Sequence, residues 1–429
     1  MKALTKINTI LKSETIRNGS LFSLFSFINK GIGFFLLLIL ANFITPTEYG
    51  YLNLFSTVLM VMGYFTTMSS DGYLSVSYFR DGKDAVEQCI SSALLTAAIT
   101  STLFVLILFF WGEFISSRLH LPIQVLYLAI LIRILSVPSG MAMNYFRIQK
   151  KVITYGILSC GNSLLFFCFA IFFVKWMQLS WQGYVLSQTS CNFIFGIWAL
   201  CFFLHKKFIC RPSIDFWKKM LLWGIPLIPH LATIFIKQGC DRYIINHFHG
   251  VEEVGLFSFA LNLANIIVTV GMAFNASNSV TLFEILSNTK IDNIQKKIQV
   301  KKFQRNIFLI YLSASVIITI AGIVFTPIFL PKYENSIPYF AILAIFGFIR
   351  CQYFLFTNIL FYYKKTKNLM YITFFSSISH LIMSLILTRY SLYYTCVIYC
   401  ISELLIVLLV YKKSKDLLER NLQEDIINT

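Results

Sequence analysis

The sequence predicts an all-α polytopic membrane protein with about twelve transmembrane helices in two six-helix lobes, arranged as a parallel 6+6 repeat. Three observations lead to this fold class. Hydrophobic residues make up 57% and charged residues 13% of the 429 residues, against roughly 45–50% and about 25% in soluble proteins. Apolar segments of bilayer length recur along the whole chain. Short motifs repeat between the two halves.

The composition excludes several classes of protein. A soluble fold would have too few charged groups to cover this apolar surface, and intrinsic disorder requires the opposite composition. The net charge of +17 would suggest nucleic acid in a soluble protein, but in a membrane protein it belongs to cytoplasmic helix ends. We therefore expect no nucleic-acid partner. The ten cysteines lack the spacing of metal ligands or of a disulfide framework, so we expect neither a metal nor a cofactor. We also expect no cleavable signal peptide, because the N-terminal region lacks its features.

Twelve apolar segments reach the length of about 20 residues that a bilayer requires. In chain order they are 20–44, 51–70, 90–111, 121–146, 152–174, 181–204, 221–248, 254–280, 307–325, 337–362, 369–387 and 392–411. The turns between them alternate in charge. Of the 36 Lys and Arg residues, 27 lie at the termini and in every second loop, and four (Arg118, Lys175, Lys332 and Arg389) lie in the other loops. This alternation predicts twelve helices with both termini in the cytoplasm.

These boundaries define the expected organisation. We expect a first lobe at 1–205, a cytoplasmic linker at 206–219, a second lobe at 220–411 and a cytoplasmic tail at 412–429. The outer loops are too short for a catalytic domain, and the longest inner loops contain no Gly-rich phosphate loop. We therefore expect a protein that is not an enzyme and does not hydrolyse ATP.

Two pairs of motifs indicate the repeat. Glu48 stands two residues before a Gly in a short outer turn that opens a helix, and Glu253 does the same 205 residues later. Ile132-Arg133 in the fourth segment is matched by Ile349-Arg350 in the tenth. An even number of helices per repeat gives both halves the same orientation, as in transporters whose halves are related by an axis along the membrane normal.

The remaining five cations lie inside apolar segments, and they are Lys30, Arg133, Lys237, Arg242 and Arg350. A charge at the bilayer centre costs about 2.5–3.5 kcal/mol on insertion scales. The obvious intramembrane carboxylates are fewer, namely Asp241 and Glu403, with Asp71 at a helix end. A water-filled cavity that admits an anion would resolve this imbalance.

Alternative interpretations of these groups stay open. Lys237 and Asp241, four residues apart, would form a simple ion pair on one helix face. Arg242 would reach the outer headgroups, and Arg133 and Arg350 would brace helix ends. Glu403 would either exchange a coupling ion during transport or form an ion pair that only stabilises the fold.

Polar residues at helical spacing predict the cavity lining, and Gly and Pro predict hinges. The expected lining residues are Ser26, His230, Asn262, Asn265 and Thr357. The expected hinge residues are Gly31, Gly33, Gly224, Pro226 and Pro229. His230 and His380 are more typical of satisfied polar groups than of metal ligands. Interhelical hydrogen bonding alone would also explain the polar stripes.

Two motifs carry a family resemblance. FINKGIGF at 27–34, followed by ITPTEYG at 44–50, resembles the Wzx-type polysaccharide biosynthesis flippases of the multidrug/oligosaccharidyl-lipid/polysaccharide (MOP) exporter superfamily. DRY at 241–243, followed by EVGLF at 253–257, looks like the counterpart in the second half. The resemblance implies a two-lobed, MATE-like bundle with a central cationic cavity.

The resemblance also implies a function. Such proteins translocate undecaprenyl-diphosphate-linked oligosaccharide repeat units across the bacterial inner membrane for O-antigen, capsule or exopolysaccharide synthesis, by alternating access coupled to an ion gradient. Polysaccharide polymerases and glycosyltransferases would be partners. Because a diphosphate needs Lys or Arg donors, Lys30, Arg133, Lys237, Arg350 and Arg242 are the candidate diphosphate contacts. Asp241 and Glu403 are the candidates for ion coupling.

Several other functions remain to be distinguished. A MATE-type multidrug antiporter would favour acidic cavity residues, and a lipid II flippase would carry further helices. A membrane-embedded polymerase or ligase would present a large outer loop. A purely structural membrane protein would not need cations within the bilayer.

Overall fold

The computed structural model describes residues 14–82, 85–228, 233, 235–237, 239–288, 291–363 and 365–427. Every element of secondary structure in these residues is helical. Eleven spans among them are long and apolar enough to cross a membrane, which confirms the expected all-α polytopic fold class. The expected span 221–248 contains residues outside the described ranges.

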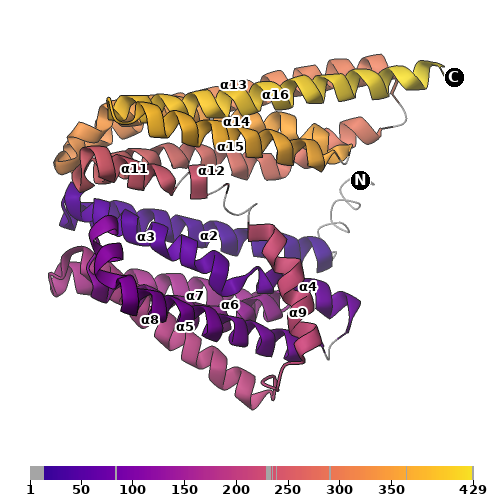
Figure 1. Ribbon diagram of the computed structural model, residues 1–429. Coiled ribbons are helices and arrows are strands. Elements are labelled where there is room, and N and C mark those ends of the chain that lie inside the picture. Colours follow the sequence, from indigo (N-terminus) through magenta and orange to yellow (C-terminus); the bar gives the residue numbers. More distant parts are fainter. Residues whose placement is uncertain are drawn as a thin grey trace. The chain divides into compact units, whose positions relative to one another are not determined.

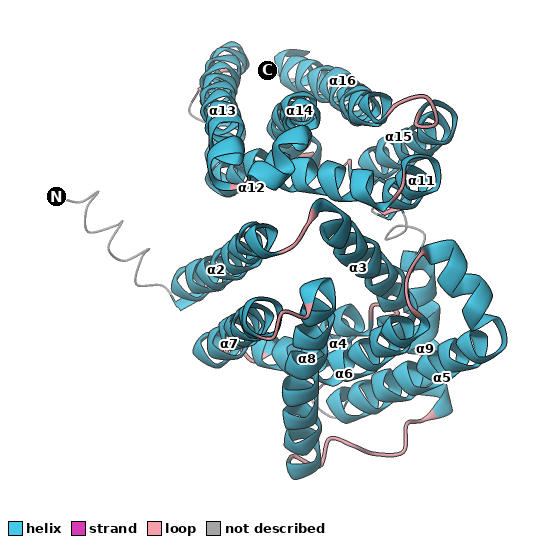
Figure 2. Cartoon of the chain, turned by 90° about the vertical axis from the view of Figure 1, so that its left-hand side faces the viewer, coloured by secondary structure: helices cyan, strands magenta, loops and turns pink. Residues whose placement is uncertain are grey.

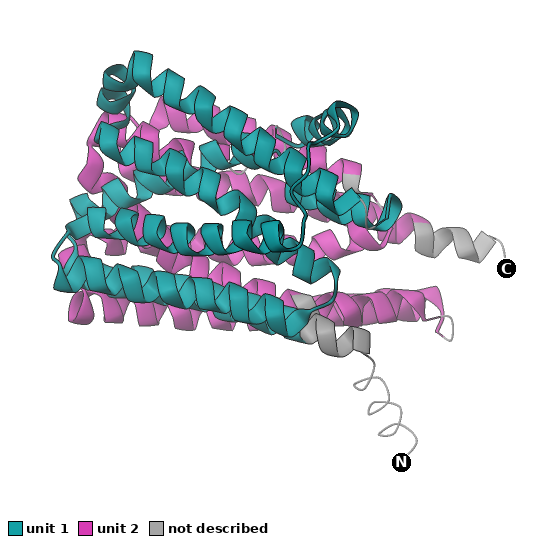
Figure 3. Ribbon diagram, turned by 90° about the horizontal axis from the view of Figure 1, so that it is seen from below, with its two compact units in different colours: residues 1–232 teal, residues 233–429 magenta. Residues whose placement is uncertain are grey.

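The chain divides into two units of mutually packed helices, residues 1–232 and residues 233–429 (Figure 3). The helices of unit 1 are α2 (Glu14–Phe43), α3 (Pro46–Thr67), α4 (Ser70–Arg80), α5 (Ala85–Leu119), α6 (Ile123–Ile148), α7 (Val152–Ile171), η1 (Phe172–Trp176), α8 (Ser180–His205), α9 (Ile214–Gly224) and η2 (Ile225–Leu227). Those of unit 2 are α11 (Cys240–His249), α12 (Val251–Ser287), α13 (Asn293–Phe329), η3 (Pro331–Ser336), α14 (Ile337–Tyr362), α15 (Thr366–Leu387) and α16 (Leu392–Ile427), as labelled in Figure 1.

The two units share one scheme of helix packing. In unit 1, α6 packs against α3, α5 and α8, and α7 packs against α2 and α8. In unit 2, α14 packs against α12, α13 and α16, and α15 packs against α11 and α16. Figure 2 views α13, α14 and α16 nearly end-on. Helices α3, α6, α7 and α8 of unit 1 therefore correspond to α12, α14, α15 and α16 of unit 2, which agrees with the repeated motifs.

A capping box at the start of α3 explains the three-residue spacing of Thr45 and Glu48. The side chain of Thr45 accepts a hydrogen bond from the Glu48 backbone amide, and the Glu48 carboxylate accepts one from the Thr45 amide. This arrangement satisfies two backbone donors that a helix start leaves unpaired. Met68 and Ser69 adopt left-handed conformations that interrupt the helix. The span nevertheless continues beyond the expected end at residue 70, because α4 extends it to Arg80.

The segment expected to be a linker, 206–219, contains the start of a helix that belongs to unit 1. Met220 of α9 is fully buried among residues of α4, α5 and α8. The indole of Trp217 donates a hydrogen bond of 2.9 Å to the hydroxyl of Thr96 on α5. Helix α9 therefore belongs to unit 1, which extends to residue 232.

The expected run 221–248 is not one continuous helix. Helix α9 ends at Gly224, the 3₁₀ turn η2 follows with Pro226 in it, and α11 begins at Cys240 after a turn at Gly239. The expectation that Lys237 and Asp241 share one helix face is therefore wrong, because the turn at Gly239 separates them. Pro breaks the helical hydrogen-bond ladder, which accounts for η2.

Several helices extend beyond their apolar segments. Helix α13 begins at Asn293, although its apolar segment begins at residue 307, and α16 continues to Ile427, through the expected tail. The two extensions lie close enough for Lys297 and Glu419 to approach within 3.9 Å. Both side chains are exposed, so this pair contributes little to stability.

Close packing of α8 against α6 yields a stability prediction. A Cβ atom at Gly196 would lie 2.6 Å from the backbone oxygen of Leu135, whereas one at Gly161 would meet nothing nearer than 3.9 Å. We expect Gly196→Ala to lower the free energy of unfolding by about 1–3 kcal/mol. Gly161→Ala should raise it by about 1 kcal/mol, because Ala favours helix. Unfolding by SDS in mixed micelles, followed by circular dichroism, would measure both, and equal effects would contradict the close approach.

Candidate functional site

A buried carboxylate in unit 2 is shared by two cations. Glu403 on α16 is 2% exposed. One of its oxygens lies 3.3 Å from Lys237 Nζ, and the other lies 2.5 Å from Arg350 Nη1 on α14. The side chains of Lys237 and Arg350 keep 17% and 32% of their surface exposed. We call these three residues the Glu403 cluster. Its net charge is positive, and its exposed part consists of the cations.

Arg350 is also held by an aromatic ring. Its guanidinium carbon lies 4.8 Å from the ring centre of Tyr353, which is three residues further along α14. This cation–π contact fixes one face of the guanidinium. The next predicted polar residue, Thr357, is buried and donates its hydroxyl to the Tyr353 carbonyl. Thr357 therefore satisfies its donor within its own helix.

A second buried network surrounds Asp241 on α11. Asp241 is fully buried, and its two carboxylate oxygens lie 2.7 Å from His380 Nε2 and 2.5 Å from the Ser384 hydroxyl, both on α15. The other ring nitrogen of His380 lies 3.0 Å from the hydroxyl of Ser402 on α16. An ionised carboxylate only accepts hydrogen bonds, so His380 and Ser384 are the donors. We call this set the Asp241 network.

Tyr399 joins the Asp241 network to the Glu403 cluster. Its ring stands edge-on to His380, with 4.9 Å between ring centres, and its hydroxyl donates to the backbone oxygen of Lys237. Tyr399 lies one helical turn before Glu403 on α16. The two sets of charged groups are therefore connected through one buried residue. Sequence reasoning treated His380 as a satisfied polar group, but its partner Asp241 lies 139 residues away and no local pattern indicates it.

The ion pair between Lys237 and Asp241, which the sequence left open as an alternative, is not formed. Lys237 pairs with Glu403, and Asp241 pairs with His380. Of the two interpretations of Glu403, the structure contains the ion pair, with two cations and not one. Arg242 follows Asp241 on α11 and is half-buried.

Arg133 in unit 1 occupies the position on α6 that corresponds to Arg350 on α14. Its guanidinium lies against Gly63 of α3, where an added Cβ would come within 3.1 Å of the guanidinium carbon. The buried Nε of Arg133 has no hydrogen-bond partner, and no carboxylate lies within 4 Å, among the residues that the structure describes. Helix α8, the counterpart of α16 in the packing scheme, contains no Asp or Glu. Arg133 therefore lacks the internal partner that Arg350 has.

Lys30 in unit 1 is exposed on α2. The neighbouring Asn29 donates a hydrogen bond to the Ser159 hydroxyl on α7, so Lys30 projects from another side of α2. Within the described part of the chain, no carboxylate pairs with Lys30. Ser26 is exposed one turn earlier.

The structure places the other predicted residues as follows. Helix α2 runs without a break through Gly31 and Gly33. Asn262 and Asn265 are half-buried on α12, and the Asn265 carbonyl accepts a hydrogen bond from Thr269. Pro229 and His230 lie outside the described residues. Among the residues that were described, no group of three His, Cys, Asp or Glu side chains could hold a metal ion.

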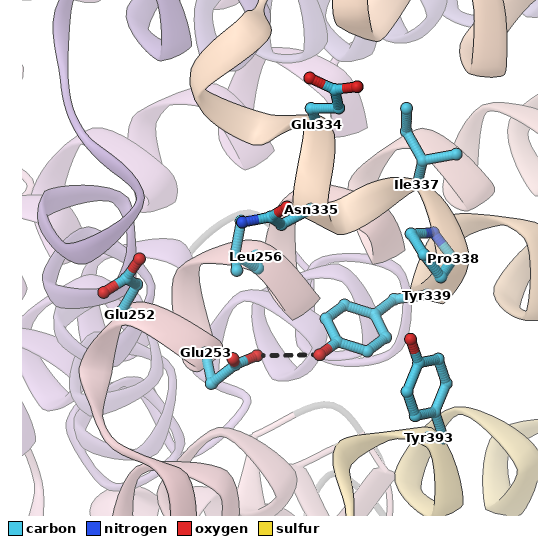
Figure 4. Close-up of a pocket in the computed structure, with 9 residues that line it drawn as sticks. All are labelled: Glu252, Glu253, Leu256, Glu334, Asn335, Ile337, Pro338, Tyr339 and Tyr393. Atoms are coloured by element: carbon cyan, nitrogen blue, oxygen red, sulfur yellow. Dashed lines mark hydrogen bonds between the residues drawn. The ribbon is translucent and has the colours of Figure 1, made fainter.

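Unit 2 also contains an acidic pocket that sequence reasoning missed (Figure 4). Its volume is about 540 Å³. Its lining residues are Glu252, Glu253, Leu256, Glu334, Asn335, Ile337, Pro338, Tyr339 and Tyr393. The Tyr339 hydroxyl donates a 3.1 Å hydrogen bond to Glu253, and the rings of Tyr339 and Tyr393 lie 5.1 Å apart. Glu252 and Glu253 stand in the first turn of α12, where carboxylates stabilise a helix. The pocket is acidic, whereas the Glu403 cluster carries a net positive charge.

Comparison with protein families decides the classification. A family model described as polysaccharide biosynthesis protein matches residues 15–283, which is more than half of the chain. The chain belongs to the polysaccharide biosynthesis protein family. Two curated relatives of this family member come from Haemophilus influenzae. The Lsg locus putative protein 1 is 22% identical over 79% of this chain and 82% of its own length. An uncharacterized membrane protein is 21% identical over 85% of this chain and 88% of its own length.

Solved structures agree with the fold of this polysaccharide biosynthesis protein. An inward-facing multidrug resistance MATE transporter of the MOP superfamily has a TM-score of 0.73 at 10% identity and covers 94% of this chain and 96% of its own. The lipid II flippase MurJ has a TM-score of 0.68 at 15% identity, over 92% and 87% of the two chains. A MOP superfamily transporter from Pyrococcus furiosus, with a binding pocket of reverse polarity, has a TM-score of 0.61 at 10% identity, over 93% and 95%. At these identities the likeness concerns the fold, which is MATE-like.

Proposed function

We propose that this multi-pass membrane protein is a flippase for polyprenyl-diphosphate-linked oligosaccharide repeat units. It moves them from the inner to the outer leaflet of the bacterial cytoplasmic membrane, for the synthesis of a surface polysaccharide such as O-antigen, capsule or exopolysaccharide. Both termini lie in the cytoplasm, and transport follows alternating access. The polysaccharide biosynthesis family and the transporter fold support this proposal.

The observation that carries the proposal is the excess of cations within membrane-spanning helices. Lys30 and Arg133 have no carboxylate partner among the described residues, and Lys237 and Arg350 share the single carboxylate of Glu403. Uncompensated cations in lipid are costly and mark the path of a ligand. A diphosphate supplies the missing negative charge and accepts charge-assisted hydrogen bonds from Lys and Arg.

Each predicted residue has a role in this proposal. Lys30, Arg133, Lys237, Arg350 and Arg242 contact the diphosphate during transit. Ser26, His230, Asn262, Asn265 and Thr357 form the polar path for the glycan, while the polyprenyl chain stays in lipid. Gly31, Gly33, Gly224, Pro226 and Pro229 serve as hinges. Asp241 and Glu403, the buried carboxylates of unit 2, are the groups at which an ion gradient would be coupled to transport.

The competing functions differ in the charge that they require. A multidrug antiporter for cationic compounds needs a carboxylate that is free to bind substrate, whereas Asp241 and Glu403 are both engaged by donors of unit 2. A polymerase or ligase needs a catalytic group outside the membrane. The cation excess favours an anionic lipid-linked substrate over both.

Deletion of the gene tests the proposed function. Lipid-linked oligosaccharides extracted from the deletion strain and analysed by mass spectrometry should show complete repeat units on the diphosphate carrier, together with loss of surface polysaccharide. Complementation with the wild-type gene is the control. Unchanged carrier lipids and intact surface glycan, also in a strain that lacks any second flippase of the family, would reject the proposal.

A further inference from the structure

We propose that Glu403 is a built-in competitor of the substrate diphosphate. In the empty protein its carboxylate occupies Lys237 and Arg350, and a diphosphate binds these two cations by displacing it. This inference rests on the proposed function for the identity of the natural ligand. It assigns to Glu403 control over how tightly the headgroup is held and over its release.

The geometry of the Glu403 cluster supports competition. Each oxygen of Glu403 contacts a different cation, at 3.3 Å for Lys237 and 2.5 Å for Arg350. Phosphate oxygens accept the same kind of charge-assisted hydrogen bond from Lys and Arg. A diphosphate that reaches these donors therefore meets positions that the carboxylate already fills.

The exposure of the three side chains indicates from which side a ligand reaches the cations. Glu403 is 2% exposed, whereas Lys237 and Arg350 keep 17% and 32% of their side-chain surface open. Glu403 thus holds the cations from the protein interior, and their outer sides stay accessible to a ligand. Because Tyr353 also contacts the guanidinium of Arg350, the arginine remains positioned when Glu403 leaves it.

The repeat within the chain supplies a comparison. Arg133 stands at the position that corresponds to Arg350, but α8, the counterpart of α16, contains no Asp or Glu that could pair with it. Unit 1 therefore offers a guanidinium without an internal competitor, and unit 2 offers one with a competitor. A carboxylate that served only to neutralise an arginine in this scaffold would be expected in both units. Its presence in one unit favours a function specific to that site.

Competition also explains release. Two cations without a counter-charge would hold a diphosphate tightly in every conformation, and a substrate that binds equally well throughout the cycle is not transported faster. Return of Glu403 to Lys237 and Arg350 replaces the bonds that the departing diphosphate loses. The same return neutralises part of the charge of the empty protein.

The test measures diphosphate affinity directly. Full-length protein in nanodiscs of phosphatidylcholine, which carries no net charge, would be titrated with inorganic diphosphate by isothermal calorimetry. We expect Glu403→Gln to bind it at least about tenfold more tightly than the wild type, which is the effect of removing one charged hydrogen-bond competitor. The matched control is Glu253→Gln in the acidic pocket, where the amide oxygen still accepts from Tyr339, and its affinity should equal that of the wild type.

A second variant keeps the test decisive if Glu403→Gln does not fold. Glu403→Asp keeps the charge but is one methylene shorter, so it contacts both cations less well and should bind diphosphate more tightly than the wild type by a smaller factor. If Glu403→Gln does not accumulate, Glu403→Asp decides the question. Equal or weaker binding by the folded variants, or no binding by any of them, overturns the inference.

The outcome for the proposed function is read separately, from surface glycan in the deletion strain. Tighter diphosphate binding by Glu403→Gln with intact glycan in that strain supports the competition and rejects the flippase function. Loss of glycan with accumulated repeat units, but unchanged diphosphate affinity in Glu403→Gln, supports the flippase and rejects the competition.

Discussion

Replacing Asp241 with alanine is expected to lower the free energy of unfolding by about 3–5 kcal/mol, the range for removing one partner of a buried pair. Asp241 and His380 are both fully buried, 2.7 Å apart, and Ser384 donates to the second carboxylate oxygen. Alanine would leave the ring N–H of His380 and the Ser384 hydroxyl without an acceptor in the interior. Titration with SDS in mixed micelles, followed by circular dichroism, would measure the loss.

Two further variants make this expectation specific. Asp241→Asn keeps the shape and one acceptor oxygen, so it should lose about half as much stability as Asp241→Ala. Asp215→Ala removes an exposed carboxylate from the first turn of α9 and should change stability by less than about 1 kcal/mol. A loss for Asp241→Ala no larger than that for Asp215→Ala would show that the network contributes nothing to stability.

Replacing Lys30 with alanine is expected to reduce export of the surface glycan by at least about tenfold, the effect of one lost charge-assisted hydrogen bond. Lys30 is exposed on α2 and has no carboxylate partner among the described residues. Because no ion pair with a described residue depends on its charge, the abundance of the protein in the membrane should stay near normal. Surface glycan and accumulated lipid-linked repeat units would be quantified in the same cells.

The matched controls separate charge from position. Lys30→Arg keeps a cation at this site and should retain most of the export. Lys206→Ala removes an exposed cation after the end of α8 and should leave export unchanged. Normal surface glycan in Lys30→Ala cells, at equal protein abundance, would reject the role of Lys30 in binding the headgroup.

The sequence predicted the fold well because the membrane imposes strong rules on it. A segment that crosses the bilayer must be apolar over about 20 residues. Its backbone hydrogen bonds are made within the segment, so each helix can be recognised from its own stretch of sequence. Helix ends were less predictable. The polar first turns of α13 and the last turns of α16 are helical, although their sequence contains no apolar segment that would indicate a helix.

The candidate site was predictable in its residues but not in its contacts. Lys237, Arg350 and Glu403 are conspicuous as charges in apolar segments, yet Glu403 lies 53 residues from Arg350 and 166 from Lys237. Such pairs depend on the packing of α14 against α16, which periodicity does not encode. The prediction of a pair between Lys237 and Asp241 was wrong because a short turn at Gly239 interrupts the helix. The acidic pocket was missed because its glutamates come from two distant helix starts.

The length of α16 has a practical consequence. Its 36 residues span about 54 Å at 1.5 Å per residue, whereas the hydrocarbon layer is about 30 Å thick. A substantial part of this helix, which bears Glu403, therefore lies outside the lipid tails. A fluorophore fixed rigidly to these outer turns would tilt with the helix. The polarisation of its emission in single molecules would therefore report changes in the tilt of α16 during transport.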